Sequence, residues 1–233
     1  MTTELIVLST TAATIGFFHT LFGPDHYVPF IFMAKARRWT ILKTSIVTIA
    51  CGLGHVGSSI LVGTIGIIFG LAVGKLELFE GFRGNIAALA FIAFGLVYFI
   101  WGLRRATSIK PHRHTHFHQD GTLHSHDHNH LHSHDHLHKQ NITPWILFTI
   151  FVLGPCEPLI PILMYPASEF SFSGLFLICT LFSSVTIATM LVLVLSATFG
   201  LSFLHLGKLE KYSHALAGGI IMISGLGIIF LGL

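Results

Sequence analysis

Six long apolar stretches, separated by short polar segments, run through the 233-residue chain. A helix needs about 20 mostly apolar residues to cross a bilayer. The stretches of this kind lie at 4–23, 42–73, 85–103, 145–166, 174–200 and 215–233. Prolines interrupt or directly follow the first and the fourth stretch, so we expect a broken helix at each. The pattern predicts an all-α membrane protein with six transmembrane helices.

The composition of the chain agrees with a membrane protein. Charged residues make up only 10% of it and its mean hydropathy is +0.76, whereas a soluble domain carries about 25% charged residues. The net charge of +3 is small and no basic face interleaves with aromatic residues, so no nucleic acid is expected as a partner. The three cysteines are an odd number in apolar surroundings, which does not indicate a disulfide framework.

Lysine and arginine are distributed unevenly between the predicted loops. In a six-helix arrangement only Lys75 and Arg83 fall on one side. The other eleven fall on the opposite side, namely Lys35, Arg37, Arg38, Lys43, Arg104, Arg105, Lys110, Arg113, Lys139, Lys208 and Lys211. Basic loops stay on the cytoplasmic side of a membrane. We therefore expect a multi-pass protein of the cell membrane with both termini outside.

The two halves of the chain resemble each other. Gly23-Pro24 followed by Met33 matches Gly154-Pro155 followed by Met164 at an offset of 131, and a glycine pattern that begins at Gly95 recurs at an offset of 130. Two nearly equal offsets in the same order indicate a duplicated three-helix unit. An odd number of helices per unit places the two units in opposite orientations, which is a common plan of transporters.

This duplication defines the expected domains. Residues 1–103 form the first three-helix repeat, residues 104–144 a cytosolic histidine-rich loop, and residues 145–233 the second repeat. The two repeats are expected to be inverted relative to each other, each with a broken first helix.

The stretch from His19 to Pro29 places ionisable groups between apolar segments. It holds His19, Asp25 and His26 together with two prolines. Ionisable groups at membrane depth are costly and usually face the interior of a bundle or a wet cavity. We expect a broken helix with the three side chains gathered at the break. The alternative is a kinked helix whose polar groups only bond their neighbours.

Three further residues are candidates for the same site. In the repeat alignment Cys156 and Glu157 take the places of Asp25 and His26, so two broken helices would bring nitrogen, oxygen and sulfur ligands together. Such a set suits a divalent transition metal better than magnesium or calcium. Alternatively, Cys156 is a small buried apolar residue and Glu157 pairs with a base. His55, among small residues, is either a ligand or gate residue or a core histidine bonded to a serine.

The loop between the repeats carries twelve of the 17 histidines. Histidine-rich tracts are typical of metal binding, and a segment with so few apolar residues is expected to be disordered without metal. The alternative is a solvated linker. The candidate residues for metal capture are His112, His114, His116, His118, His124, His126, His128, His130, His132, His134, His136 and His138.

The stretch from His19 to His26, with Gly23-Pro24 before the aspartate, resembles the transmembrane nickel/cobalt transporter superfamily. The similarity is greatest to NicO-type nickel/cobalt exporters and UreH-like membrane proteins. The resemblance implies two three-helix halves, a histidine-rich cytosolic loop between them, and Ni²⁺ or Co²⁺ as substrate. The importers of that superfamily are characterised by four residues between histidine and aspartate, whereas this chain has five between His19 and Asp25.

Three alternative functions make different demands on these residues. A metal uptake permease would use the same ligands in the opposite direction. A thiol or electron carrier of the CcdA type needs one cysteine in each repeat. The position of the first repeat that is equivalent to Cys156 is Asp25, so the second cysteine is missing. A sulfite or sulfonate exporter of the TauE type would want basic groups at the site instead of Asp25 and Glu157.

The sequence therefore indicates a transporter and not an enzyme. The expected substrate is Ni²⁺ or Co²⁺, with Zn²⁺ as an alternative, moved by efflux, and no tightly bound cofactor is expected. The chain has no Gly-x4-Gly-Lys-Ser/Thr loop for a nucleotide, so transport is expected to be secondary-active. The expected partners are the metal ion and the lipid bilayer, with a homo-oligomer left open.

Overall fold

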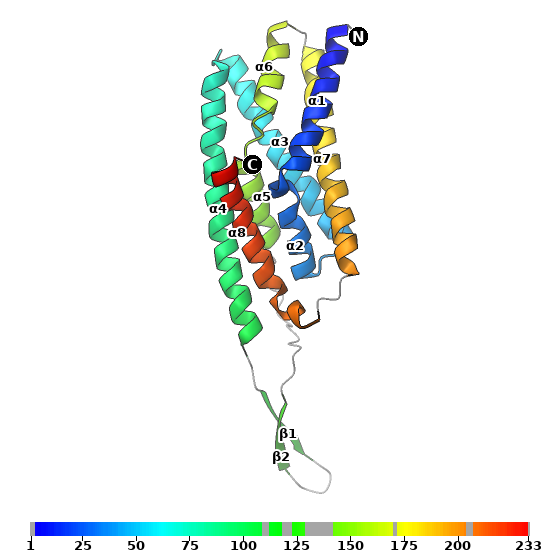
Figure 1. The fold of residues 1–233 in the computed structure, drawn as a ribbon, viewed down its shortest axis with the longest axis vertical. Coiled ribbons are helices and arrows are strands. Elements are labelled where there is room, and N and C mark those ends of the chain that lie inside the picture. Colours follow the sequence, from blue (N-terminus) through cyan, green and yellow to red (C-terminus); the bar gives the residue numbers. More distant parts are fainter. Residues whose placement is uncertain are drawn as a thin grey trace.

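The computed structural model describes residues 3–108, 112–117, 123–128, 142–169, 172–203 and 207–232. Its helices lie side by side in an elongated bundle, and a β-hairpin projects from one end (Figure 1). Five of the described helices are long and apolar enough to cross a membrane, which indicates a multi-pass membrane protein. They are α1 (Thr3–Phe22), α3 (Ile41–Ile68), α4 (Val73–Thr107), α7 (Phe172–Ser202) and α8 (Ser213–Leu231).

The first apolar stretch is interrupted where the sequence predicts. Helix α1 ends at Phe22, a short 3₁₀ turn η1 (Pro24–His26) follows, and α2 (Val28–Arg37) continues the chain. Pro24 has no N–H to donate, so the intrahelical ladder stops before it, whereas Pro29 sits in the first turn of α2, where its missing N–H costs nothing.

The fourth apolar stretch is interrupted in the same way. Helix α5 (Thr143–Leu153) ends just before Gly154-Pro155, and α6 (Leu159–Glu169) begins after Pro158. Each half is 11 residues long, which is too short to cross a membrane alone. The two interruptions predicted at Gly23-Pro24 and Gly154-Pro155 are thus confirmed.

The third apolar stretch differs from the prediction. We expected a loop between residues 73 and 85, but α4 already begins at Val73 and runs for 35 residues. Glu80 and Arg83 lie one turn apart in this helix and pair with each other in its buried face, so their charges do not force the chain into water. The preceding turn uses Gly70, whose φ of +60° is a backbone conformation that suits glycine.

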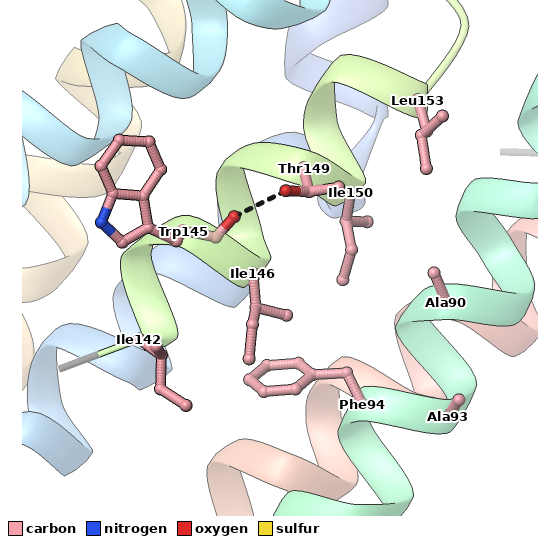
Figure 2. Close-up of a pocket in the computed structure, with 9 residues that line it drawn as sticks. All are labelled: Ala90, Ala93, Phe94, Ile142, Trp145, Ile146, Thr149, Ile150 and Leu153. Carbon is pink, nitrogen blue, oxygen red and sulfur yellow. Dashed lines mark hydrogen bonds between the residues drawn. The ribbon is translucent and has the colours of Figure 1, made fainter. Parts of the chain in front are cut away.

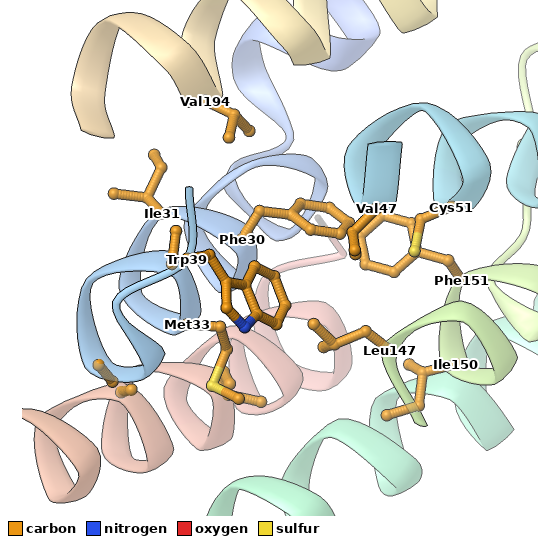
Figure 3. Packing of buried hydrophobic residues seen from close by; sticks show 14 of the residues in the cluster. Phe30, Ile31, Met33, Trp39, Val47, Cys51, Leu147, Ile150, Phe151 and Val194 are labelled. Carbon is orange, nitrogen blue, oxygen red and sulfur yellow. The ribbon is translucent and has the colours of Figure 1, made fainter. Parts of the chain in front are cut away.

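The helices pack as a bundle around two apolar clusters. Helix α4 lies against α8, α1 against α7, and α3 against both α5 and α7. One cluster lies between α2, α3 and α5, where the rings of Phe30 and Phe151 are 4.7 Å apart and Cys51 and Leu147 are fully buried (Figure 3). The broken segments are therefore held by side-chain packing close to both breaks.

Basic side chains tie several helix ends together at the end of the bundle that carries the hairpin. Lys35 donates from Nζ to the carbonyl of Leu201 at 2.8 Å, close to the end of α7. The guanidinium of Arg38 lies 3.0 Å from the Glu210 carboxylate. A cation next to the last carbonyls of a helix is favourable because those carbonyls carry partial negative charge.

The hairpin is formed by β1 (His112–Phe117) and β2 (Leu123–His128), which pair antiparallel. Histidines occupy opposite positions in this register, with His112 opposite His128, His114 opposite His126 and His116 opposite His124. We expected this segment to be disordered without metal, and over these residues the structure has a hairpin instead. The His-x-His order has the period of two that a strand requires.

Candidate metal centre

Three histidines from two separate segments meet inside the bundle. His19 lies in the last turn of α1, His26 in the 3₁₀ turn that follows, and His55 near the middle of α3. Each offers one ring nitrogen, and these three atoms all lie within 4.8 Å of one another. The break in the first helix is what places His26 back against His19, because their rings would otherwise be two helical turns apart.

Asp25 and Gly23 determine which nitrogen of His26 faces the group. Nδ1 of His26 lies 3.2 Å from the carbonyl of Gly23 and 3.1 Å from Oδ1 of Asp25. Both partners are acceptors, so Nδ1 carries the proton and Nε2 presents its lone pair to the centre. A carboxylate behind a histidine is the usual arrangement around a metal-binding imidazole.

Gly23 is required at this point by close approach. A Cβ on this residue would lie only 2.5 Å from Nδ1 of His26. Any other residue would push the imidazole away from the Gly23 carbonyl and out of the group.

The spacing of the nitrogens fits a transition metal. Nε2 of His26 lies 3.3 Å from Nε2 of His55. Two imidazole nitrogens that bind one metal tetrahedrally at about 2.0–2.1 Å lie about 3.3–3.4 Å apart. Nε2 of His19 is buried and has no hydrogen-bond partner among the described residues. A buried polar atom without a partner is costly, and a metal ion would satisfy it.

Two helix ends lie beside the three histidines. Helix α1 ends at the site, and the end of α5 lies nearby, because a Cβ on Gly154 would be 3.4 Å from Nδ1 of His55. The ring of Phe151 in the last turn of α5 is 6.2 Å from the ring of His55. The C-terminal end of a helix carries a partial negative charge, so two such ends beside the imidazoles favour a bound cation.

The remaining predicted ligands lie in different places. Asp25 contacts the centre through His26, as described above. Cys156 is fully buried, but its backbone nitrogen faces Ser59 and Glu80, and its thiol does not belong to the histidine group. Glu157 is exposed. The structure thus brings together His19, His26 and His55 and leaves the residues of the second break outside the group.

A buried ion pair at the second break was missed from the sequence. Glu80 is fully buried and Arg83 nearly so, and the two side chains form an ion pair. The available signal is two opposite charges three residues apart within an apolar run, whereas the six-helix arrangement predicts Arg83 in a loop outside the membrane.

This pair joins the two halves of the broken helix. Arg83 donates to the carbonyl of Val152 at 2.8 Å, close to the end of α5. Glu80 accepts from the backbone nitrogen of Cys156 at 3.2 Å, in the segment that leads to α6. Polar backbone groups that the helix break leaves unpaired thus find charged partners, as a broken helix inside a membrane requires. We call Glu80 and Arg83 the break clamp.

The break clamp also touches the helix that carries His55. Arg83 donates to Oγ of Ser58 at 2.6 Å, and that hydroxyl donates to the carbonyl of His55 at 2.8 Å. The second break is therefore connected to the centre through α3, although it supplies no ligand.

The hairpin of β1 and β2 projects away from the bundle (Figure 1). Six of the twelve loop histidines lie at paired positions in the hairpin, as described above. The other six, His118, His130, His132, His134, His136 and His138, lie outside the described residues.

Two apolar grooves lie on the sides of the bundle, and neither includes the three histidines. One, of about 520 Å³, lies between α4 and α5, where Phe94, Ile146 and Ile150 line it (Figure 2). The other, of about 600 Å³, lies between α3 and α7 and includes Phe176 and Leu191. Their apolar linings suit lipid chains and not a metal ion.

No family model, curated protein or solved structure matches the chain.

Proposed function

We propose that this protein carries a divalent transition metal, Ni²⁺ or Co²⁺ with Zn²⁺ as an alternative, across a membrane. The observation that carries the proposal is a group of three imidazoles at a helix break in the middle of an apolar bundle. One ring nitrogen from each imidazole lies within 4.8 Å of the other two. Imidazole nitrogen is a good ligand for these metals and a poor one for magnesium or calcium.

The ligand set favours a transported ion over a permanent structural one. Structural zinc sites are closed by four protein ligands, whereas three ligands leave a position open for exchange. Broken helices with their ends at a buried site are typical of transporters, in which the site must open to each side in turn. His19, His26 and His55 are the proposed ligands, and Asp25 positions His26.

We further propose that the bundle consists of two inverted three-helix repeats. In this arrangement α1 with α2 corresponds to α5 with α6, α3 to α7, and α4 to α8, and corresponding helices run in opposite directions (Figure 1). The paired halves α5 and α6 form the sixth span. Residues 1–103 and 145–233 are the repeats, and 104–144 the loop between them.

A reciprocal contact between α4 and α8 supports this symmetry. The backbone of Gly95 packs against Gly218, and Gly225 packs against Ala88. At the repeat offset of 130, Ala88 is equivalent to Gly218 and Gly95 to Gly225. The contact of Gly95 with Gly218 is therefore equivalent to the contact of Gly225 with Ala88. Such reciprocity is expected wherever two related units meet across a two-fold axis.

The proposed direction is efflux from the cytosol. The basic side chains at the hairpin end of the bundle favour that end as cytosolic, with both termini outside. The histidine-rich loop is then on the cytosolic side, where it would collect metal for export. The uptake permease remains the alternative in which the same site is loaded from outside.

The buried arginine argues against an anion exporter. Three contacts of the Arg83 guanidinium go to Glu80, Ser58 and the Val152 carbonyl, so this charge is already used inside the protein. An anion site would need a basic group facing the substrate.

Metal flux into vesicles tests the proposal. Purified protein is reconstituted into liposomes that contain a metal-sensitive dye, and Ni²⁺, Co²⁺, Zn²⁺ and Mg²⁺ are added in turn. We expect flux of at least one transition metal, none of Mg²⁺, and loss of flux in His26→Ala. His214→Ala is the matched control, because His214 bonds Tyr98 at the far end of α4. Equal flux through His26→Ala and the unmodified protein would contradict the proposal.

A further inference from the structure

Helix α7 is the helix of the second half of the chain that packs against α1, where His19 lies, and α3, where His55 lies. It packs against α1, α2 and α3, the segments around the three ligands. Its buried polar residues, within the part of α7 whose side chains are described, are Thr186 and Thr189. The hydroxyl of Thr189 donates to the carbonyl of Val185 at 2.8 Å, whereas Oγ1 of Thr186 is fully buried and has no partner among the described residues.

Two glycines locate Thr186 relative to the ligands. Oγ1 of Thr186 lies 3.1 Å from the place that a Cβ of Gly16 would occupy. Gly16 is one turn before His19 on the same face of α1, and side chains on a helix lean back towards its N-terminus, so the imidazole of His19 covers this turn. On α3, Gly52 lies one turn before His55 and contacts Ile187, the neighbour of Thr186.

The hydroxyl of Thr186 and Nε2 of His19 are thus two buried polar atoms that both lack partners and that border the same region between α1 and α7. Leaving either unpaired is unfavourable, because its hydrogen bond to water is lost on burial and nothing replaces it. A single guest would satisfy both, because a metal ion accepts the lone pair of His19 and a water molecule on that metal accepts or donates a hydrogen bond at Thr186.

We propose that Thr186 is a positioning residue that holds the water in the fourth coordination position of the metal. The inference rests on the proposed function. A metal with three imidazoles keeps one position for water or an incoming ligand, and a hydroxyl of the protein would fix that water in the absence of a fourth protein ligand. The repeat alignment supports the position of Thr186 beside the centre, because at an offset of 131 Thr186 is equivalent to the proposed ligand His55.

Cobalt binding to purified full-length protein tests this role. The twelve loop histidines are replaced by serine so that only the bundle is measured, and Co²⁺ is titrated while its visible absorption is followed. Thr186→Val has nearly the same shape without the hydroxyl, and Thr186→Ser keeps the hydroxyl. Thr189→Val removes a buried hydroxyl whose hydrogen bond is made within its own helix.

We expect Thr186→Val to weaken Co²⁺ binding about ten- to a hundredfold, which is the usual effect of removing a partner behind the coordination sphere. Its absorption spectrum should also change, because the geometry at the fourth position is no longer fixed. Thr186→Ser and Thr189→Val should bind like the parent protein. If valine at position 186 prevents folding, Thr186→Ala gives the same comparison.

The outcomes separate the two proposals. Binding by Thr186→Val or Thr186→Ala that matches the parent in affinity and spectrum would overturn the role of Thr186 and leave the metal centre intact. A parent protein that binds no Co²⁺ would overturn the metal centre itself, and the role of Thr186 with it.

Discussion

Nε2 of His26 lies 3.3 Å from Nε2 of His55. Because Nδ1 of His26 faces two acceptors, its Nε2 has a lone pair and no proton. The contact between the two nitrogens therefore needs either a proton on His55 or a metal ion between the rings. The same contact allows protons and metal to compete for one place.

Acid should release the metal from the centre. Metal binds the neutral form of imidazole, whose ordinary pKa is about 6.5. As the pH falls below this value, each ligand that takes up a proton must lose it before the metal can bind, so the affinity falls with falling pH. Equilibrium dialysis with Ni²⁺ between about pH 5 and pH 8 measures this. An affinity that stays constant over this range would contradict the competition between protons and metal at this centre.

The break clamp should stabilise the protein and keep Cys156 inaccessible. Arg83→Met leaves the buried carboxylate of Glu80 without its charge partner, which costs about 3–5 kcal/mol for a typical buried pair. We expect a lower unfolding temperature in detergent and faster alkylation of Cys156, whose backbone nitrogen is bound by Glu80.

Two variants serve as controls for the break clamp. Glu80→Leu combined with Arg83→Met removes both charges and should recover part of the stability, because no buried charge is left unpaired. Arg38→Ala breaks the exposed pair with Glu210 and should change stability by no more than about 0.5 kcal/mol. Arg83→Met as stable as the parent would show that the pair does not hold the break.

Close packing of α4 on α8 should depend on Gly95. A Cβ there would overlap the backbone of Met222, so Gly95→Ala must push the two helices apart and should cost about 1–3 kcal/mol. Gly81, on the same helix, has open space around it, and Gly81→Ala should stabilise by up to about 1 kcal/mol through helix propensity. The unfolding temperatures of the two variants in detergent measure these changes. Similar changes in unfolding temperature for Gly95→Ala and Gly81→Ala would argue against the reciprocal contact.

Much of the local structure could be predicted from the sequence. Prolines remove backbone donors in any context, so Pro24 and Pro155 indicated both helix breaks. The part of the site that is local in sequence, His19 with His26, followed from the same break. His55 is distant in sequence from His19 and His26. Whether it is a ligand or a core residue depends on how α3 packs against the break, which the sequence alone does not give.

Other features depend on tertiary contacts that no local pattern contains. By its charge alone Arg83 is predicted to lie in a loop, and only its buried partner Glu80 and its half-buried partner Ser58 allow it to lie in a helix. The repeat alignment placed Cys156 and Glu157 opposite the histidines, but the backbone of Cys156 is held by Ser59 and Glu80 and Glu157 is exposed. In the proposed repeats, equivalent positions share a place in the backbone plan, whereas their side chains can take different roles.

Removing the loop should separate metal capture from transport. Deletion of residues 112–138 removes the twelve loop histidines, and among the described residues the apolar clusters of the bundle are formed by the helices and not by the hairpin. We expect the shortened protein to insert and fold normally, and to transport metal with a higher KM and a similar maximum rate. Flux into liposomes over a range of Co²⁺ concentrations measures both quantities. A folded deletion variant without flux at any concentration would make the loop part of the path itself.

Titration of Co²⁺ into the purified protein tests the central claim, that the three buried imidazoles bind a transition metal. Full-length protein with its loop histidines replaced by serine should bind one Co²⁺ per chain and develop visible absorption. His26→Ala and His55→Ala in this background should each lose both signals, while His214→Ala should keep them. A protein that binds no Co²⁺, or that binds it equally well after His26 and His55 are both replaced, would contradict the account.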